Sequence, residues 1–456
     1  MTCTPSHIRT PFHKQPFAKI SLQRYVRRHP QTSTIGDLVT SLGPSFHRLW
    51  LAATTSNLGD GIVLVGAPLL AIQLTREPVA VAGVQAAFTL PALVFALHAG
   101  AIADRRDRRS LLLIAAVLRA VALLGAGIGA AFGLLPLPVL YLAVFAVGIG
   151  VVVFDTTTQS TIPDVVETDQ LGAANGRIIG AQTVMNNFVG APLAGVLVGA
   201  AAASVLLGPA LLYVIAALLL LRLPRRTTPS PPPTTRMRDD IAEGLRVLRG
   251  HAALRSIGLL AGLLNLGNAA YFGVFVLFVV GEDAPMGLPE IAFGGLAAAL
   301  AAGSVAGSFV AGRLERALGP RRVLIGGVAV ASLLMLLPVI TAAILPVAVF
   351  AFLLGVASLA VNVVSVTSRQ RVVPRRLLGR VNAAFRLLAM GAMPVGAALG
   401  GGVASAFGLR PLFIAVVVLQ LGALALLQRP IRDTALLTPQ PDLGADGEAT
   451  AGALHG

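Results

Sequence analysis

The stretch that decides the fold is EIAFGGLAAALAAGSVAGSFVAGR, residues 290–313, in which no charged residue lies between Glu290 and Arg313. A helix that crosses a bilayer needs roughly 20 apolar residues at about 1.5 Å per residue, and this run is of that length. The pattern predicts a membrane-spanning helix. Runs of the same kind lie between residues 77 and 104, 255 and 282, 386 and 410, and 410 and 429.

Three longer runs predict pairs of spans. Residues 177–222 and 322–369 are about twice as long, and residues 110–154 are similar if Arg119 is tolerated inside a span. Turns rich in Pro or Gly at 135–138, 199–204 and 341–346 divide them. With a first span at 49–75, interrupted by Asp60, the predicted total is 12 membrane helices in an all-α membrane protein.

The composition excludes other classes of protein. The chain has 456 residues, of which 55% are hydrophobic and 12% charged. Its mean hydropathy of +0.81 rules out both an ordinary soluble enzyme and a disordered polypeptide. Cys3 is the single cysteine, so an internal disulfide or a Cys-based metal site cannot form. We expect no metal and no cofactor.

The net charge of +15 could indicate either a nucleic-acid-binding surface or the orientation of the chain in the membrane, and the distribution of Lys and Arg favours the second interpretation. With the N-terminus inside, every Lys and Arg except Arg76, Arg119 and Arg410 falls on one face, which the positive-inside rule makes cytoplasmic. These charges are spread over short loops and are not gathered with aromatic side chains, so we expect no nucleic-acid partner. The Arg-rich, Lys-poor usage is typical of a GC-rich bacterial genome, so we expect a bacterial cytoplasmic membrane. The charges of the loops place both termini on its cytoplasmic side.

The spans divide into two similar sets of six around a Pro-rich segment, Thr228–Thr235. Three patterns recur in the same order in both halves, which indicates the parallel repeats from which rocking transporters are built. The matched pairs are Asn57-Leu-Gly-Asp60 with Asn265-Leu-Gly-Asn268, Gly100–Arg109 with Gly312–Arg322, and Gln159–Asn175 with Gln370–Asn382.

These patterns predict five segments along the chain. They are a disordered basic cytoplasmic tail at 1–46, an N-terminal six-helix bundle at 47–222, a cytoplasmic linker with an amphipathic helix at 223–255, a C-terminal six-helix bundle at 256–430, and a disordered tail at 431–456. The amphipathic helix can be interfacial or a plain solvated linker.

The loop Gly100-x-x-x-Asp104-Arg105-x-x-Arg108-Arg109 resembles the signature loop of the major facilitator superfamily. Glu243–His251, with Pro163 and Asn175, is similar to its drug-exporter branch of macrolide and enterobactin exporters. The resemblance implies a monomeric transporter of two pseudo-symmetric six-helix bundles. It also implies a cytoplasmic latch, for which we select Gly100, Asp104, Arg105, Arg108 and Asp155.

The latch residues allow two interpretations, a charge cluster or a role in membrane orientation alone. Asp104 and Arg108 are four residues apart and share a face if the loop continues a helix. Asp155, which we expect at the cytoplasmic end of the fourth span, is a candidate third partner. The arginines, Arg105 in particular, can instead serve only to orient the chain in the membrane.

Asp60, in the middle of the first span, is our candidate for proton coupling. A carboxylate at that depth is costly unless it faces a wet cavity or takes up a proton. The alternative is a permanently neutral Asp60 in a structural hydrogen bond between helices. Arg119, ten residues into the third span, can bind a substrate anion, pair with Asp60, or form a purely structural ion pair.

Uncharged polar residues in spans one, five and seven predict the lining of a central cavity that suits an amphipathic compound better than a sugar. Each of them can alternatively be a structural contact between helices. Together with Arg119, the predicted lining residues are Asn57, Gln182, Asn186, Asn187, Asn265, Asn268 and Tyr271.

The absence of enzyme motifs completes the functional prediction. The chain has only Lys14 and Lys19 and lacks a Walker A loop, so it cannot hydrolyse ATP by that route, and it carries no hydrolase motif. We expect no catalytic residue and no enzyme. We expect proton-coupled export of a small amphipathic compound such as an antibiotic or siderophore. The alternatives are an importer of a metabolite and a non-transporting receptor or scaffold on the same fold.

Overall fold

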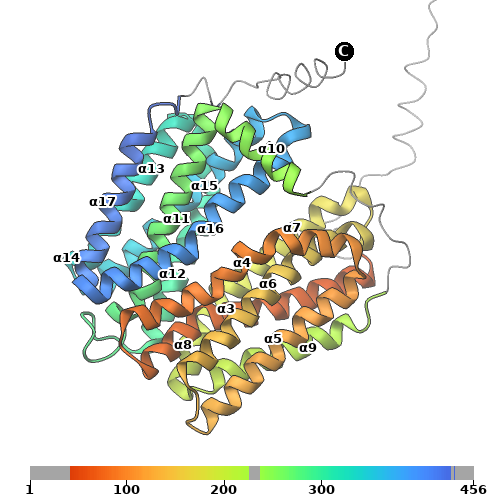
Figure 1. Cartoon of the computed structure of the whole chain (residues 1–456), viewed down its shortest axis with the longest axis vertical. Coiled ribbons are helices and arrows are strands. Elements are labelled where there is room, and N and C mark those ends of the chain that lie inside the picture. Colours follow the sequence, from red (N-terminus) through yellow and green to blue (C-terminus); the bar gives the residue numbers. More distant parts are fainter. Residues whose placement is uncertain (1–41, 225–236, 433–435, 437–456) are drawn as a thin grey trace, which may run out of the picture. The chain divides into compact units, whose positions relative to one another are not determined.

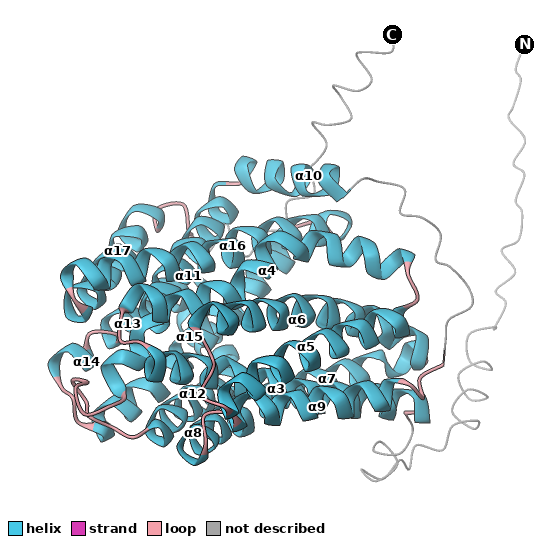
Figure 2. Cartoon of the chain, turned by 60° about the horizontal axis from the view of Figure 1, so that its bottom comes forward, coloured by secondary structure: helices cyan, strands magenta, loops and turns pink. Residues whose placement is uncertain are grey.

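The computed structural model describes residues 42–224, 237–432 and 436. The tail predicted at 1–46 lies mostly outside these residues, as do the Pro-rich segment 228–235 and most of the tail at 431–456. Pro44–Gly456 forms one compact unit. All described elements are helices, apart from one isolated bridge between Val280 and Leu288 (Figure 2).

The first bundle consists of six spans. They are α3 (Pro44–Leu74), α4 (Pro78–Arg105), α5 (Arg108–Ala131), α6 (Leu137–Val165), a fifth span built from α7 (Leu171–Thr183), the π-helix η2 (Val184–Gly190) and α8 (Ala191–Ala200), and α9 (Ser204–Leu220). A short 3₁₀ turn, η1 (Thr168–Gln170), precedes the fifth span.

The second bundle repeats this order after α10 (Met237–Gly250). Its spans are α11 (Ala252–Val279), α12 (Glu290–Leu318), α13 (Pro320–Leu334) continued by α14 (Leu337–Ile340), α15 (Ile344–Val372), α16 (Arg375–Phe407) and α17 (Leu409–Leu427). The two bundles are coloured red to yellow-green and green to blue in Figure 1.

The predicted number of spans is confirmed. In the described residues, 11 segments are long and apolar enough to cross a membrane, and Ser204–Leu220 is a shorter apolar helix that completes the set of twelve. The predicted turns lie where α5 meets α6, α8 meets α9, and α14 meets α15. The chain is therefore an all-α membrane protein of two six-helix bundles.

The two bundles contact each other at the end that holds residues 75–77, 280–289 and 408, which we call the hairpin end. Arg76 Nη1 donates to the Val280 carbonyl at 2.8 Å, and Ser405 donates to the Glu77 carboxylate. Gly195 of α8 lies against the backbone of Glu290, so a side chain there would collide with α12. The opposite end, with residues 221–224 and 237–252, is the linker end.

Helix α10 packs on the second bundle. Gly244 lies directly against the backbone of Arg380 in α16, and Glu243 forms an ion pair with Arg380. Leu248 is buried against Leu377 and neighbouring residues of α16. The amphipathic face predicted from sequence therefore covers α16 at the linker end.

Candidate functional site

A buried ion pair occupies the middle of the first bundle. Arg119 Nη1 of α5 donates to both oxygens of Asp60 of α3, at 3.0 Å to Oδ1 and 3.3 Å to Oδ2. Tyr213 of α9 donates its hydroxyl to Asp60 Oδ1 at 2.7 Å. The Arg119 and Tyr213 side chains are fully buried and Asp60 is 6% exposed. Three helices thus meet at one carboxylate.

Two aromatic rings and a glycine surround the long side chain of Arg119. Its guanidinium lies 4.6 Å from the Phe154 ring centre and 4.5 Å from that of Tyr213, so it interacts with two aromatic faces. Gly150 of α6 faces the Arg119 stem, and a Cβ at that position would overlap it. Arg119 Nη2 is buried without a hydrogen-bond partner in the described chain.

Asp60 is therefore not the bare carboxylate that the sequence suggested. Its partner is Arg119, one of the alternatives that the sequence left open, and neither residue is among those that line the two polar cavities described below. The reason is packing: glycines at 59 and 150 let Tyr213 and Arg119 approach close enough to enclose the carboxylate. Sequence reasoning missed Tyr213, although a tyrosine in an otherwise apolar span was a usable signal.

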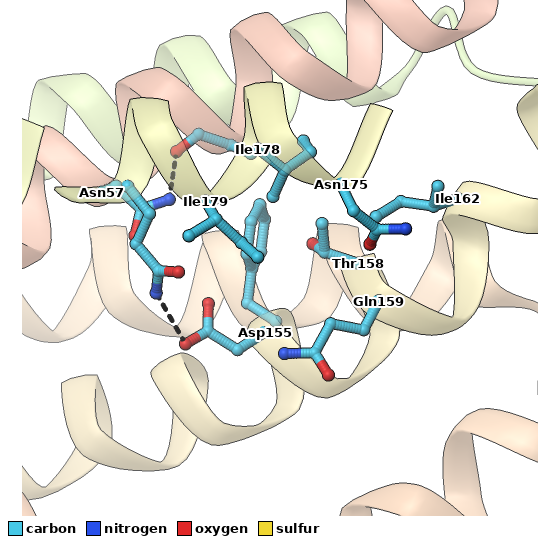
Figure 3. A pocket seen from close by; sticks show the side chains of 11 residues that line it. Asn57, Asp155, Thr158, Gln159, Ile162, Asn175, Ile178 and Ile179 are labelled. Atoms are coloured by element: carbon cyan, nitrogen blue, oxygen red, sulfur yellow. Dashed lines mark hydrogen bonds between the residues drawn. The ribbon is translucent and has the colours of Figure 1, made fainter. Parts of the chain in front are cut away.

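A cavity of about 400 Å³ lies on the linker side of this pair, between α3, α6 and α7. Figure 3 shows its polar lining, in which Asn57, Asp155, Thr158 and Asn175 face the same space. The Asp155 carboxylate accepts a hydrogen bond from Gln182 Nε2 at 3.3 Å and interacts electrostatically with Asp60 and Arg119. Asn57, Asp155 and Gln182 are thus brought together.

A second cavity, of about 250 Å³, lies between α11, α13, α15, α16 and α17 of the second bundle. Asn265 and Asn268 line it together with Gln420 and Arg369, in a cavity of the second bundle alone and not in the single central cavity that the sequence predicted. Gln420 Nε2 donates to Asn268 Oδ1 at 3.0 Å, and Ser332 donates to Gln420 Oε1 at 2.9 Å. This hydrogen-bond network contains no charge.

Besides Arg119, three predicted lining residues are not among those that line the two polar cavities. Tyr271 is fully buried, packs against Phe413 with the ring centres 4.1 Å apart, and donates its hydroxyl to the Met335 carbonyl. Asn187 is exposed and donates to the Thr183 carbonyl. The backbone of Asn186 packs against Gly61, and neither amide lines the two polar cavities. Position within a span did not reveal which face each side chain takes.

Of the predicted latch residues, Arg108 and Asp155 have described side chains. Arg108 pairs with Asp164 of α6 at 2.5 Å and donates to the Ser160 carbonyl, whereas Asp155 lies deeper, in the first cavity. Asp155 is therefore not at the end of its span as expected. The side chains of Gly100, Asp104 and Arg105 lie outside the described residues.

The family described as transmembrane secretion effector matches residues 40–444. Among curated proteins, the chain is 27% identical over 396 residues to the enterobactin exporter EntS of Escherichia coli O1:K1 / APEC, covering 82% of this chain and 91% of that protein. The EntS protein of Shigella boydii serotype 18 is 27% identical over 399 residues, with the same coverage.

Solved structures show the same fold. A bacterial homologue of the human lysosomal transporter Spinster is 16% identical with a TM-score of 0.64, covering 87% of this chain and 98% of that chain. The nucleoside transporter NupG is 12% identical with a TM-score of 0.67, covering 86% and 100%. A bacterial homologue of the iron transporter ferroportin is 17% identical with a TM-score of 0.65, covering 86% and 100%.

Proposed function

Because the chain belongs to the transmembrane secretion effector family of the major facilitator superfamily, we propose that it exports a small amphipathic compound, such as a siderophore or an antibiotic, in exchange for protons. The chain is a multi-pass transporter rather than an enzyme, and its substrate is a small molecule. The direction of transport, its coupling to protons and the class of compound are what we propose. Relatives named enterobactin exporters support the direction.

The buried pair of Asp60 and Arg119 carries the proposal of proton coupling. Protonation of Asp60 would leave the Arg119 guanidinium buried without a counterion, which costs roughly 3–5 kcal/mol. That cost is avoided in a conformation where Arg119 reaches water or another anion. A proton that binds two conformations with different free energies shifts the balance between them, which is what coupling requires.

Asp155 offers Arg119 the alternative partner. Its carboxylate lines the first cavity and already interacts electrostatically with both Asp60 and Arg119. Arg386 of α16 also interacts with Asp155, so a change at this group would be felt in the second bundle. We propose that Asp60 takes up the proton and that the Arg119 guanidinium moves toward Asp155 in the same step.

The arrangement of the bundles supports the direction of opening. Among the described residues, Arg76 with Val280 and Gly195 with Glu290 join the bundles at the hairpin end, and the first cavity lies in the linker half. With the positive-inside orientation, the linker end is cytoplasmic and this conformation would accept a compound from the cytoplasm. We propose that one chain, with both termini cytoplasmic, performs the transport.

The test is transport in inverted and right-side-out vesicles under an imposed pH gradient, with a panel of siderophores and antibiotics. An exporter accumulates substrate in inverted vesicles acidified inside. We expect Asp60→Asn to lose gradient-driven uptake while counterflow without a gradient persists. The matched control is Asp283→Asn on the exposed hairpin-end loop, which should transport normally. Full gradient-driven transport by Asp60→Asn would remove the proposed coupling.

A further inference from the structure

The second cavity contains a buried cation that the proposed coupling step does not use. Arg369 of α15 is 7% exposed, and its Nε and Nη1 atoms have no hydrogen-bond partner in the described chain. Its guanidinium lies 3.5 Å from the ring centre of Phe385 on α16. Unpaired buried charges are costly, so an arginine held in this way indicates a missing anion.

Neighbouring arginines at the linker end are satisfied in a different way. Arg371 pairs with Glu315, and Arg380 pairs with Glu243. Among the described residues that line the second cavity, by contrast, Arg369 is the single charged one. Arg371 and Arg380 therefore have carboxylate partners, whereas no described residue that lines the second cavity has a carboxylate.

The polar face of α15 leads into the cavity. Ser358, Asn362, Ser365 and Arg369 follow one another at spacings of four, three and four residues, which places them on one face of the helix, and all four line the cavity. Apolar side chains such as Leu264 and Met335 form other parts of the wall. The cavity therefore combines a cation and uncharged polar groups with apolar surface.

We propose that this cavity binds the anionic oxygen group, a carboxylate or phenolate, of an amphipathic organic anion, with Arg369 as the anion-binding residue and Phe385 as its aromatic support. A guanidinium presents paired donors in a plane that matches a carboxylate, and an aromatic face fixes that plane. The inference rests on the proposed function in taking this anion to be the exported compound. Anionic lipid headgroups share the chemistry and are separated from it by the test.

The experiment measures equilibrium binding of radiolabelled benzoate, with neutral benzamide as the isostere, to the full chain in nanodiscs. We expect benzoate to bind better than benzamide to the wild type. Arg369→Gln should weaken benzoate binding about tenfold or more, as expected for a lost charge-assisted pair, and should leave benzamide binding unchanged. Arg371→Gln, two residues along and paired with Glu315, is the matched control and should bind benzoate normally.

A second variant tests the same site without removing the cation. Ser365→Asp places a carboxylate one turn before Arg369 on the same face of α15, so it should pair with the guanidinium and abolish benzoate binding in a folded protein. Ser365→Asn, of the same shape but uncharged, should retain binding. Equal binding of benzoate and benzamide, or normal benzoate binding by Ser365→Asp, overturns the proposal.

The lipid composition separates the two sources of anion. Nanodiscs of phosphatidylcholine and nanodiscs containing phosphatidylglycerol should give the same benzoate affinity if the site serves the transported compound. Loss of benzoate binding in phosphatidylglycerol alone would mean that a lipid headgroup holds the site, which overturns the assignment. Benzoate binding that depends on Arg369, in a protein that transports nothing in vesicles, would sustain this inference and reject the proposed function.

Discussion

The two bundles place different chemistry at matching positions. Asp60, Arg119 and Tyr213 meet across the first, third and sixth spans of the first bundle. The same three spans of the second bundle contribute, in the same order, Asn268, Ser332 and Gln420, which form an uncharged hydrogen-bond network. One duplicated scaffold therefore carries an ion pair in one half and an amide network in the other.

The buried arginines of the two bundles also differ in how their charge is neutralised. Arg119 is enclosed with a carboxylate and is not among the residues that line the two polar cavities, whereas Arg369 lines the second cavity and has no carboxylate partner in the described part of the chain. The first cavity in turn contains the acid Asp155. In the first bundle the buried arginine is thus neutralised by a carboxylate of the same bundle, whereas in the second bundle the described residues supply no carboxylate to Arg369, which is the basis of the anion site proposed above.

The largest effect should come from breaking the ion pair. Arg119→Met leaves Asp60 buried without a counterion, so we expect a loss of about 3–5 kcal/mol in the free energy of unfolding. The double variant Asp60→Asn/Arg119→Met should recover much of that loss because it buries no isolated charge. Thermal unfolding in detergent measures both. A double variant less stable than Arg119→Met would show that the pair is not the main contribution.

Crowding the Arg119 stem should have the next largest effect. Gly150→Ala places a Cβ against the side chain, and overpacking of this kind costs about 1–3 kcal/mol. Gly125→Ala on α5 meets no atom within 4 Å and serves as the control. The matching position of the second bundle is Val361, which packs on Gly327 of α13. Equal thermal stability of both variants would contradict this account.

Breaking the uncharged hydrogen-bond network of the second bundle should lower the free energy of unfolding less than breaking the ion pair. Ser332→Ala, at the position that matches Arg119, removes one neutral hydrogen bond to Gln420 and should cost about 0.5–1.5 kcal/mol. The measurement is again thermal unfolding, alongside Arg119→Met. A cost as large as that of the Arg119 variant would remove the proposed contrast between the bundles.

The smallest effect is expected at the start of the second bundle. His251 precedes α11, and its Nδ1 accepts a hydrogen bond from the Leu254 amide at 3.2 Å. Burial lowers the pKa of His251 from its usual 6.5, because it disfavours the charged ring. This cap is therefore fully effective above about pH 6.5 and is lost as the pH falls through the lowered pKa.

We expect the loss of this cap to cost about 0.5–1 kcal/mol in acid. His251→Asn keeps a side-chain acceptor that does not titrate, so it should flatten the dependence of unfolding temperature on pH between 7 and 5. A variant with the same slope as the wild type would place the titration elsewhere.

The span count, the fold class and the repeat could be predicted because each depends on runs of residues. A charge-free run such as 290–313 has the length of a bilayer whatever its neighbours are, and α12 forms there. The site was predicted in part. Asp60 and Arg119 stand out as charges in apolar spans, but Tyr213 and Arg369 were missed, and Tyr271 was placed in a lining that it does not reach.

By itself the amino-acid sequence determined that the chain crosses a membrane twelve times in two similar halves, because hydrophobic length and charge placement act locally and need no partner. Only the tertiary structure decided which charges are neutralised. Pairing depends on which helix faces which and on how closely glycines let them approach, and those contacts join residues as far apart in the chain as Asp60 and Tyr213.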